Sequence, residues 1–440
     1  MLHADEARER ALVCLREILD AAPEGVRAVL IDDLYGRLRV LLWLQGAEHL
    51  EAQVRQGLAD AAGRYWVDDI WLGDGAGASD QIVYQQAWDE ARDIVPVRLR
   101  VLDRHRARGG WLVPLSQPQW PCDRPTGATP AIVVFYSFRG GVGRTTALAA
   151  FAIHRARMGE RVVVIDGDLD APGIGSLLAA DEHGTTARWG VVDYLLEQPL
   201  GALRLDDYYH AFRRDAVTGA GEILVFPAGR VDDQYLGKLA RIDLEPRSAA
   251  EGTHPLIALL EHIRQELQPS WLLLDARTGI DDPSGMFLSG LAHLHVLLGT
   301  ASGQTWNGLR LVLRRLGAER LQQREIQAEC VLVQAMVPRN PQVSQLARDS
   351  FQEQALEVFS DVYYAEDKGD EYRDRCWTMS DIDSQDAPHR PGVIHYDERL
   401  AFFRDIGEVA EELAASRDHA ALNQRIDARF AGHAGEDDDE

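Results

Sequence analysis

The chain has 440 residues, which is enough for two domains or for one large α/β domain with appendages. With 46% hydrophobic and 26% charged residues it has the composition of a globular protein, which excludes a disordered or fibrous chain. Its formal net charge of -24 at pH 7 disfavours broad attraction to nucleic acid or anionic membranes, because a field of this sign repels phosphate groups.

The cysteines and the N-terminal segment indicate a cytoplasmic protein. Four cysteines lie far apart and form no Cys-x-x-Cys pair, so the sequence predicts neither a zinc site nor a disulfide framework. The first 22 residues predict an amphipathic helix rather than a signal peptide, and no run reaches the ~18 apolar residues of a membrane span.

Residues 1–112 predict a small α/β domain. After the N-terminal helix, the hydrophobic periodicity predicts further helices over 47–63 and 80–93, and it predicts strands over 26–31, 37–44, 65–72 and 95–103. No set of a nucleophile, a base and an orienting group occurs here. We therefore expect this domain to bind a protein partner.

Residues 113–130 are rich in proline and predict a semi-rigid linker. Beyond the linker, the sequence predicts one α/β domain over residues 131–425 and an acidic tail over residues 426–440. Because its apolar strand runs are almost continuous and alternate with amphipathic segments, we expect a mostly parallel, doubly wound sheet. Those runs are 131–138, 161–168, 222–229, 270–277, 293–300 and 330–337. The aromatic segment 206–212 predicts a helix surface.

The segment FYSFRGGVGRTT, residues 135–146, predicts a phosphate-binding loop between a strand and a helix. In such loops, glycines let backbone N–H groups converge on phosphate oxygens, and a hydroxyl following a basic residue holds magnesium. Gly140, Gly141 and Gly143 supply the first feature and Thr145 the hydroxyl. The positive N-terminal end of the following helix adds to anion binding.

Carboxylates follow two of the predicted strands. The segment IDGDLDAPG places Asp166, Asp168 and Asp170 after one strand, and WLLLDARTG ends in Asp275. In open parallel sheets ligands bind beyond the carboxyl ends of the strands, so these groups and the loop predict one nucleotide and metal site. Asp170 is interpreted as a turn former before Pro172.

These segments resemble the ParA/MinD family of P-loop ATPases. RGGVGRTT is similar to the family's deviant Walker A loop, KGGxGK[ST], and in particular to its KGGVGR-motif variants. VVVIDGDLDAPG resembles switch I, LLLDARTG resembles Walker B with switch II, and VIHYDERLAF resembles the late IPYDxRLAF segment. The resemblance covers roughly residues 131–405 and implies ATP and Mg²⁺ as cofactors and a homodimer.

The resemblance implies three catalytic residues. Arg139 stands where the family's signature lysine reaches the partner subunit's nucleotide, and Arg144 stands where the loop lysine contacts phosphate. Asp168 matches the carboxylate that orients the attacking water. Because arginine is wider than lysine and planar, the two arginines leave both slow hydrolysis and binding without turnover open.

The resemblance also implies the binding residues. Thr145 is expected to ligate magnesium, with Asp166 and Asp275 supporting the ion through water, and Thr146 to contact the α-phosphate. Gln334 stands where the family often has an adenine-reading asparagine. The nucleotide-binding set is Gly140, Gly141, Val142, Gly143, Arg144, Thr145 and Thr146.

Two functions follow from this sequence. The first is an ATP-binding switch with slow Mg-dependent hydrolysis, whose nucleotide-dependent dimerisation controls a protein partner. The second is a non-hydrolysing, nucleotide-gated scaffold in a bacterial signalling or defence system. Nucleic acid is an unlikely partner because of the net charge, and the acidic C-terminus disfavours a membrane anchor.

Overall fold

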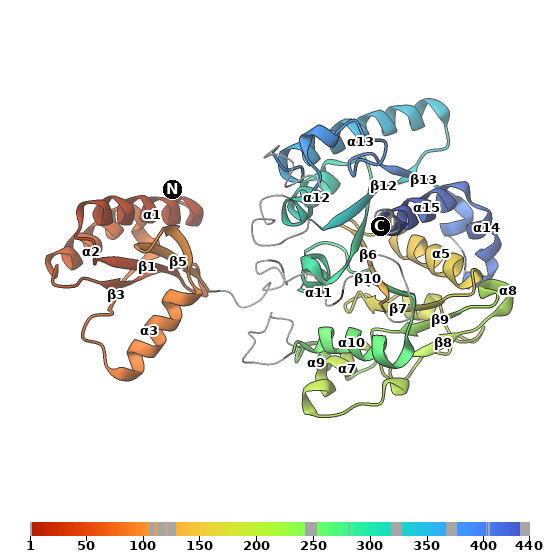
Figure 1. Cartoon of the computed structure of the whole chain (residues 1–440), viewed down its shortest axis with the longest axis horizontal. Helices are drawn as coiled ribbons and strands as arrows, with labels where there is room; N and C mark the ends of the chain where they lie inside the picture. The colour runs from red at the N-terminus through yellow and green to blue at the C-terminus, as the bar shows by residue number, and fades with distance from the viewer. Residues whose placement is uncertain are drawn as a thin grey trace, which may run out of the picture. The chain divides into compact units, whose positions relative to one another are not determined.

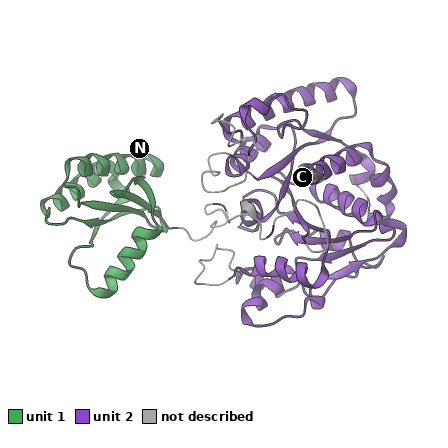
Figure 2. Ribbon diagram, viewed as in Figure 1, with its two compact units in different colours: residues 1–107 green, residues 108–440 purple. Residues whose placement is uncertain are grey.

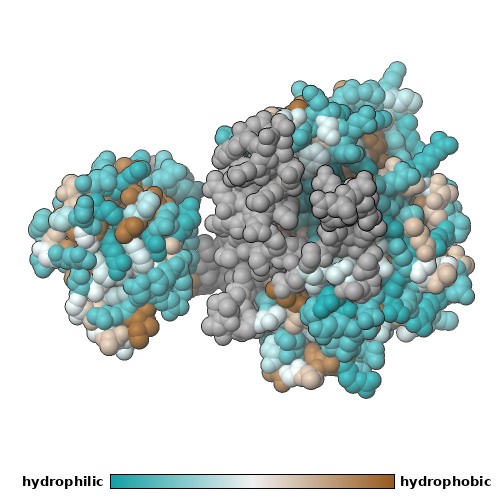
Figure 3. Space-filling model, viewed as in Figure 1, coloured by the Kyte–Doolittle hydropathy of each residue, from teal (hydrophilic) through white to brown (hydrophobic). Residues whose placement is uncertain are grey.

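The computed structural model describes residues 2–104, 111, 120, 129–242, 253–280, 282–317, 328–366, 376–401, 403 and 405–431. The chain divides into two compact units, Met1–Ala107 and Arg108–Glu440 (Figure 2). Most of the predicted proline-rich linker lies outside the described residues. Hydrophilic side chains cover most of the described surface on the face drawn in Figure 3, in keeping with the large net charge.

The smaller unit is a five-stranded sheet of order β3-β2-β1-β5-β4 (Figure 1). β1 pairs antiparallel with β2 and parallel with β5. Residues alternate between the faces: Ala28 and Leu30 pack with helices α1 and α2, whereas Val29 and Ile31 pack with α3. The elements are α1 Ala4–Ala21, β1 Arg27–Asp32, β2 Leu38–Trp43, α2 His49–Ala62, η1 Gly63–Tyr65, β3 Trp66–Leu72, α3 Ala78–Glu90, β4 Arg92–Val95 and β5 Leu99–Asp103.

The predicted helix over 80–93 is too long, because α3 ends at Glu90 and β4 begins at Arg92. The residue before a proline avoids helical angles, and Pro96 follows Val95 directly. Ile94 and Val95 are also β-branched and favour extended backbone. The strand predicted over 95–103 is therefore shorter, because β5 covers only Leu99–Asp103, and β4, which pairs antiparallel with it, lies mostly within the predicted helix.

The described residues of the larger unit contain an eight-stranded sheet of order β13-β12-β11-β6-β10-β7-β9-β8. Neighbouring strands are parallel except β8, which runs antiparallel to β9. The expected mostly parallel α/β fold is confirmed. The strands are β6 Ala131–Ser137, β7 Arg161–Gly167, β8 His210–Phe212, β9 Glu222–Phe226, β10 Trp271–Ala276, β11 Leu294–Gly299, β12 Glu329–Val337 and β13 Gly392–His395.

Helices cover both faces of this sheet (Figure 1). α5, α14 and α15 pack together on one face, and α7, α10, α12 and α13 lie on the other. The longer helices are α5 Arg144–Arg157, α7 Val191–Glu197, α10 Pro255–Leu267, α12 Gly303–Leu316, α13 Pro341–Val362, α14 Ala410–Ala415 and α15 Arg417–Ala431. Short helical segments are α6 Ile174–Leu177, η2 Gln198–Leu200, η3 Leu205–Asp207, α8 Asp215–Thr218, α9 Tyr235–Leu239, α11 Asp282–Met286, η4 Phe287–Leu291, η7 Met379–Asp381, η8 Glu398–Ala401 and η9 Ile406–Glu408.

Two further predictions are corrected in this unit. The aromatic segment 206–212 ends in the edge strand β8 instead of a helix, because β9 supplies backbone partners and Phe212 is buried there. The first residues assigned to the acidic tail belong to α15, where Ile426 and Phe430 pack into the core. Residues 432–440 lie outside the described residues. Among the described helices, none combines the length and apolarity that crossing a bilayer requires.

Candidate phosphate-binding site

A glycine loop joins β6 to α5 at the carboxyl edge of the larger sheet. Gly141 and Gly143 have φ values of 74° and 84°, which side-chain-bearing residues rarely adopt. A Cβ atom built on either glycine meets no atom within 4 Å, so the space beside the loop is open. α5 begins at Arg144 without a side-chain cap, which leaves its first backbone N–H groups free for an anion.

Strand order brings two carboxylates to the same edge. β10 lies between β6 and β7, so Asp275 is paired in register with Phe135 on one side and with Asp166 on the other. Asp275 and Asp166 are fully buried, with 1% and 0% of their surface exposed. The predicted convergence of the loop and the strand-end carboxylates is therefore present in the fold.

Arg144 points toward these carboxylates. Its Nε donates to Oδ1 of Asp275 at 2.6 Å, and its Nη2 donates to Oδ2 of Asp168 at 3.3 Å. Thr145 Oγ1 donates to the other oxygen of Asp275 at 2.8 Å. Although burial opposes the charge, Asp275 and Asp168 raise the pKa of the Arg144 guanidinium above its ordinary value. Arg144 is 8% exposed, and its Nη1 has no hydrogen-bond partner within the described part of the chain.

Asp166 is held by backbone groups. Its two oxygens accept the N–H groups of Asp168 and Gly173, each at 3.2 Å. Burial, with the nearby charge of Asp275, raises the pKa of Asp166 to about 8.

Arg277 links the two segments that follow β7 and β10. It forms an ion pair with Asp170, and its Nε lies 3.8 Å from Oδ1 of Asp168. Asp170, interpreted from the sequence as a turn former, thus also has an ionic partner. In the sequence, the position of Arg277 two residues after Asp275 placed it in the segment that resembles switch II. Its ion pair with Asp170 could not be predicted from the local sequence.

The remaining predicted residues differ in exposure. Arg139 is exposed on the loop and forms no ion pair with another described residue, Thr146 is half-buried, and Val142 is buried. Gln334 is 2% exposed, and its Nε2 donates to the carbonyl of Ala347 at 2.9 Å. Its Oε1 is buried and has no hydrogen-bond partner within the described part of the chain, so the adenine-reading role of Gln334 stays a prediction.

The donor types around the loop suit Mg²⁺, but their arrangement does not. One oxygen each of Asp275 and Asp168 accepts from Arg144, and both oxygens of Asp166 accept backbone N–H groups. Within the described ranges, no three His, Cys, Asp or Glu side chains are grouped to hold a metal ion. As arranged, the residues do not fit a hydrated Mg²⁺ ion, and the assignment of Thr145, Asp166 and Asp275 to metal stays a prediction.

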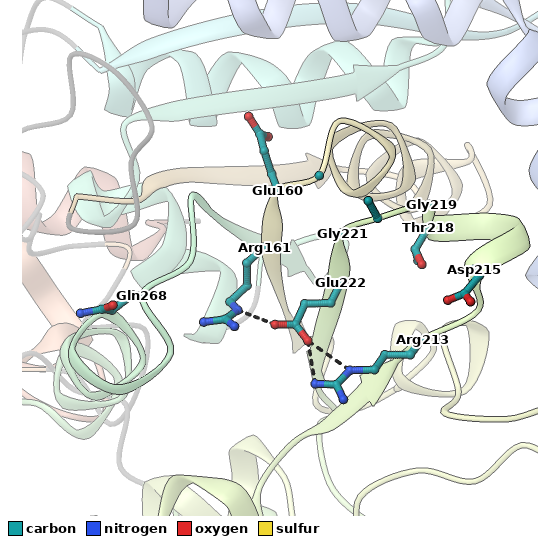
Figure 4. Close-up of a pocket in the computed structure, with 11 residues that line it drawn as sticks. Glu160, Arg161, Arg213, Asp215, Thr218, Gly219, Gly221, Glu222 and Gln268 are labelled. Carbon is teal, nitrogen blue, oxygen red and sulfur yellow. Dashed lines mark hydrogen bonds and ion pairs between the residues drawn. The ribbon is translucent and has the colours of Figure 1, made fainter.

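A separate hollow of about 620 Å³ lies at the opposite edge of the sheet, where β7 and β9 begin (Figure 4). Figure 4 shows Arg161 and Arg213 both turned toward Glu222, with which they form ion pairs. Because the carboxylate offsets their charge, these arginines do not make this hollow a strong phosphate site.

A parallel sheet whose glycine loop opens a helix beside strand-end carboxylates is the architecture of P-loop nucleotide-binding proteins. No protein-family model and no curated protein matches the chain. Solved structures that match include pNOB8 ParA bound to nonspecific DNA (TM-score 0.45, 16% identity, 68% of this chain and 98% of that chain). Another is the MinD cell division ATPase of Pyrococcus furiosus (TM-score 0.40, 16% identity, 68% of this chain and 99% of that chain). A third is apo McdA of Cyanthece (TM-score 0.43, 14% identity, 68% of this chain and 100% of that chain).

The identities between this chain and these three structures are 14–16%. Similarity at this level concerns the fold, and the ligands named for those proteins are theirs. The expectation that nucleic acid is an unlikely partner of this chain stays a prediction.

Proposed function

We propose that the larger unit is a switch controlled by ATP bound at the glycine loop. The observation that carries this proposal is the buried Arg144 guanidinium at the start of α5, directly after an open loop with two left-handed glycines. Backbone N–H groups, the helix N-terminus and the Arg144 charge all favour a polyphosphate. The exposed Arg139 adds a further positive charge.

The proposed switch consists of the segments that follow β7 and β10. Arg277 ties them together through Asp170 and Asp168. Tyr136 Oη donates to the carbonyl of Gly279 at 2.8 Å, which anchors the second segment to the strand that carries the loop. A γ-phosphate at the loop therefore lies next to both segments, and it shifts them only if it binds one arrangement more tightly than the other.

The proposal extends to a homodimer. In it, Arg139 of each subunit completes the site of the other, and the smaller unit binds a protein partner. An arginine supplied from a partner subunit can stabilise the charge of a phosphoryl-transfer transition state. The exposure of Arg139 and its lack of an ion pair with other described residues support this role.

Turnover is proposed to be slow. Asp168 is the candidate to orient the attacking water, but its Oδ2 accepts from Arg144 and its Oδ1 accepts the N–H of Ala171 at 3.2 Å. Because both oxygens of Asp168 already accept hydrogen bonds from the protein, the carboxylate is poorly placed to orient a water molecule. They favour, as the second candidate, a scaffold that binds ATP without hydrolysing it.

The test is single-turnover hydrolysis of ATP by the full chain, with the oligomeric mass recorded in the same samples. Asp168→Ala and Arg139→Ala are run beside the natural protein, and Arg213→Ala, which lies at the opposite edge of the sheet, is the control. Slow phosphate release that is lost in the first two variants, with an ATP-dependent dimer, supports the switching ATPase. Binding without release supports the scaffold, and no ATP binding contradicts both.

A further inference from the structure

Each carboxylate oxygen of Asp275, Asp168 and Asp166 already accepts a hydrogen bond from the protein. Asp275 accepts from Arg144 and Thr145, and Asp168 accepts from Arg144 and from the backbone of Ala171. The two oxygens of Asp166 accept backbone N–H groups. The cation that contacts both Asp275 and Asp168 is the guanidinium of Arg144.

The guanidinium has three nitrogens, and the structure uses two of them. Nε and Nη2 contact Asp275 and Asp168, whereas Nη1 is buried and has no partner among the described residues. A buried charged donor without a partner is costly, and its presence calls for an explanation. Because Arg144 follows directly on the glycine loop, a phosphate oxygen bound there is the natural acceptor for this nitrogen.

We infer that Arg144 takes the place of the divalent cation, so that this chain binds the polyphosphate of a nucleotide without requiring Mg²⁺. The inference rests on the proposed nucleotide site. The planar fork of arginine contacts two carboxylates and still offers a third nitrogen to phosphate. A lysine ammonium is a single point charge and cannot span these three positions, so it leaves the carboxylates to a metal ion.

The first experiment compares ATP binding to the full chain in excess EDTA and in excess Mg²⁺ by calorimetric titration. For the natural protein we expect the two dissociation constants to agree within about threefold. For Arg144→Lys we expect binding in EDTA to be at least about tenfold weaker than in Mg²⁺. The control is Arg155→Lys, which changes an equally buried arginine of α5 that pairs with Asp427 and not with the loop carboxylates.

The second experiment uses Mg²⁺ alone and reads the melting temperature without nucleotide. We expect Mg²⁺ to leave the natural protein unchanged and to raise the melting temperature of Arg144→Met, whose carboxylates have lost their cation. If Arg144→Met does not fold, Arg144→Lys serves in its place. Lysine keeps the buried positive charge but cannot span both carboxylates, so it leaves them to the metal ion.

The outcomes separate the two proposals. If the natural protein requires Mg²⁺ for ATP as strongly as Arg144→Lys does, the inference about Arg144 is wrong and the nucleotide switch stands. If ATP binds in neither buffer, the proposed function is wrong and so is polyphosphate binding without Mg²⁺, and the melting experiment with Mg²⁺ alone decides only whether Arg144 takes the place of the divalent cation. Equal stabilisation of the natural protein and Arg144→Met by Mg²⁺ overturns it.

Discussion

Arg144 and Asp275 lie 131 residues apart in the chain, and the Nε of Arg144 donates to Oδ1 of Asp275 at 2.6 Å. The contact forms because β10 is inserted beside β6, the strand that leads into the loop. Both side chains are buried, at 8% and 1% exposure. The pair therefore joins the loop to the centre of the sheet in a region from which water is largely excluded.

Asp275→Asn is expected to destabilise the larger unit by on the order of 3 kcal/mol, because it leaves a buried guanidinium without its main counter-charge. Calorimetric melting of the full chain in EDTA without nucleotide measures the change. Asp361→Asn is the control, since Asp361 is 53% exposed where it pairs with Arg310, and its loss should cost less than about 1 kcal/mol. Equal effects of the two substitutions would contradict the importance of the buried pair.

Gly143→Ala is expected to abolish ATP binding in addition to lowering stability. Gly159 offers a matched control, because its φ is 85° against 84° for Gly143, and a Cβ on either meets nothing within 4 Å. Both substitutions should cost roughly 1–2 kcal/mol of backbone strain. Gly159 lies after α5, away from the loop, so Gly159→Ala should keep the affinity for ATP. If equilibrium dialysis finds the same affinity for both variants, the loop is not the binding site.

Arg27→Met is expected to destabilise the smaller unit by about 1 kcal/mol through the loss of cation–π contacts. The Arg27 guanidinium carbon lies 4.3 Å and 4.4 Å from the ring centroids of Trp43 and Trp88, which pack edge to face. Methionine keeps the apolar stem and removes the charge. Arg37→Met is the comparison, since Arg37 covers only Tyr35, an exposed ring, at 5.2 Å. Tryptophan fluorescence during urea denaturation reports the difference, and a larger effect at Arg37 would contradict this interpretation.

His210 is expected to make the larger unit less stable in mild acid. Its Nδ1 accepts the N–H of Ala187 at 3.1 Å, and its Nε2 lies 2.9 Å from the carbonyl of Leu178, which requires a neutral ring with the proton on Nε2. Burial lowers the pKa of His210 below its ordinary value of 6.5. As the pH falls below 6.5, the unfolded chain takes up the proton first, so stability is full above this pH and declines below it.

The titration of the His210 ring, followed by NMR, tests this prediction. A midpoint at or above 6.5 would contradict it. His210→Gln is the second measurement, because glutamine removes the titrating group. Its unfolding free energy should fall less between pH 7 and pH 5 than that of the natural protein.

Local sequence determined six of the eight described strands of the larger sheet, all but β8 and β13, and the loop between β6 and α5. The apolar runs identify strands because a strand covered on both faces must be apolar throughout, and Gly141 and Gly143 identify the turn because few other residues adopt its angles. The prediction of secondary structure was less accurate for strands at the edges of the sheets and for the end of the last helix. β4 and β8 are short strands whose backbone partners are the next strands in the chain, β5 and β9, and the end of α15 depends on apolar contacts with core residues far along the chain.

The tertiary structure alone decided what the arginine at position 144 does. The sequence placed a positive charge in the loop and carboxylates after two strands, and the family resemblance assigned that charge to phosphate. The order of β6, β10 and β7 brings Asp275 and Asp168 within reach of Arg144. A buried charge needs a partner, and the main partner of Arg144 is Asp275, 131 residues away in the chain, which no local pattern can identify.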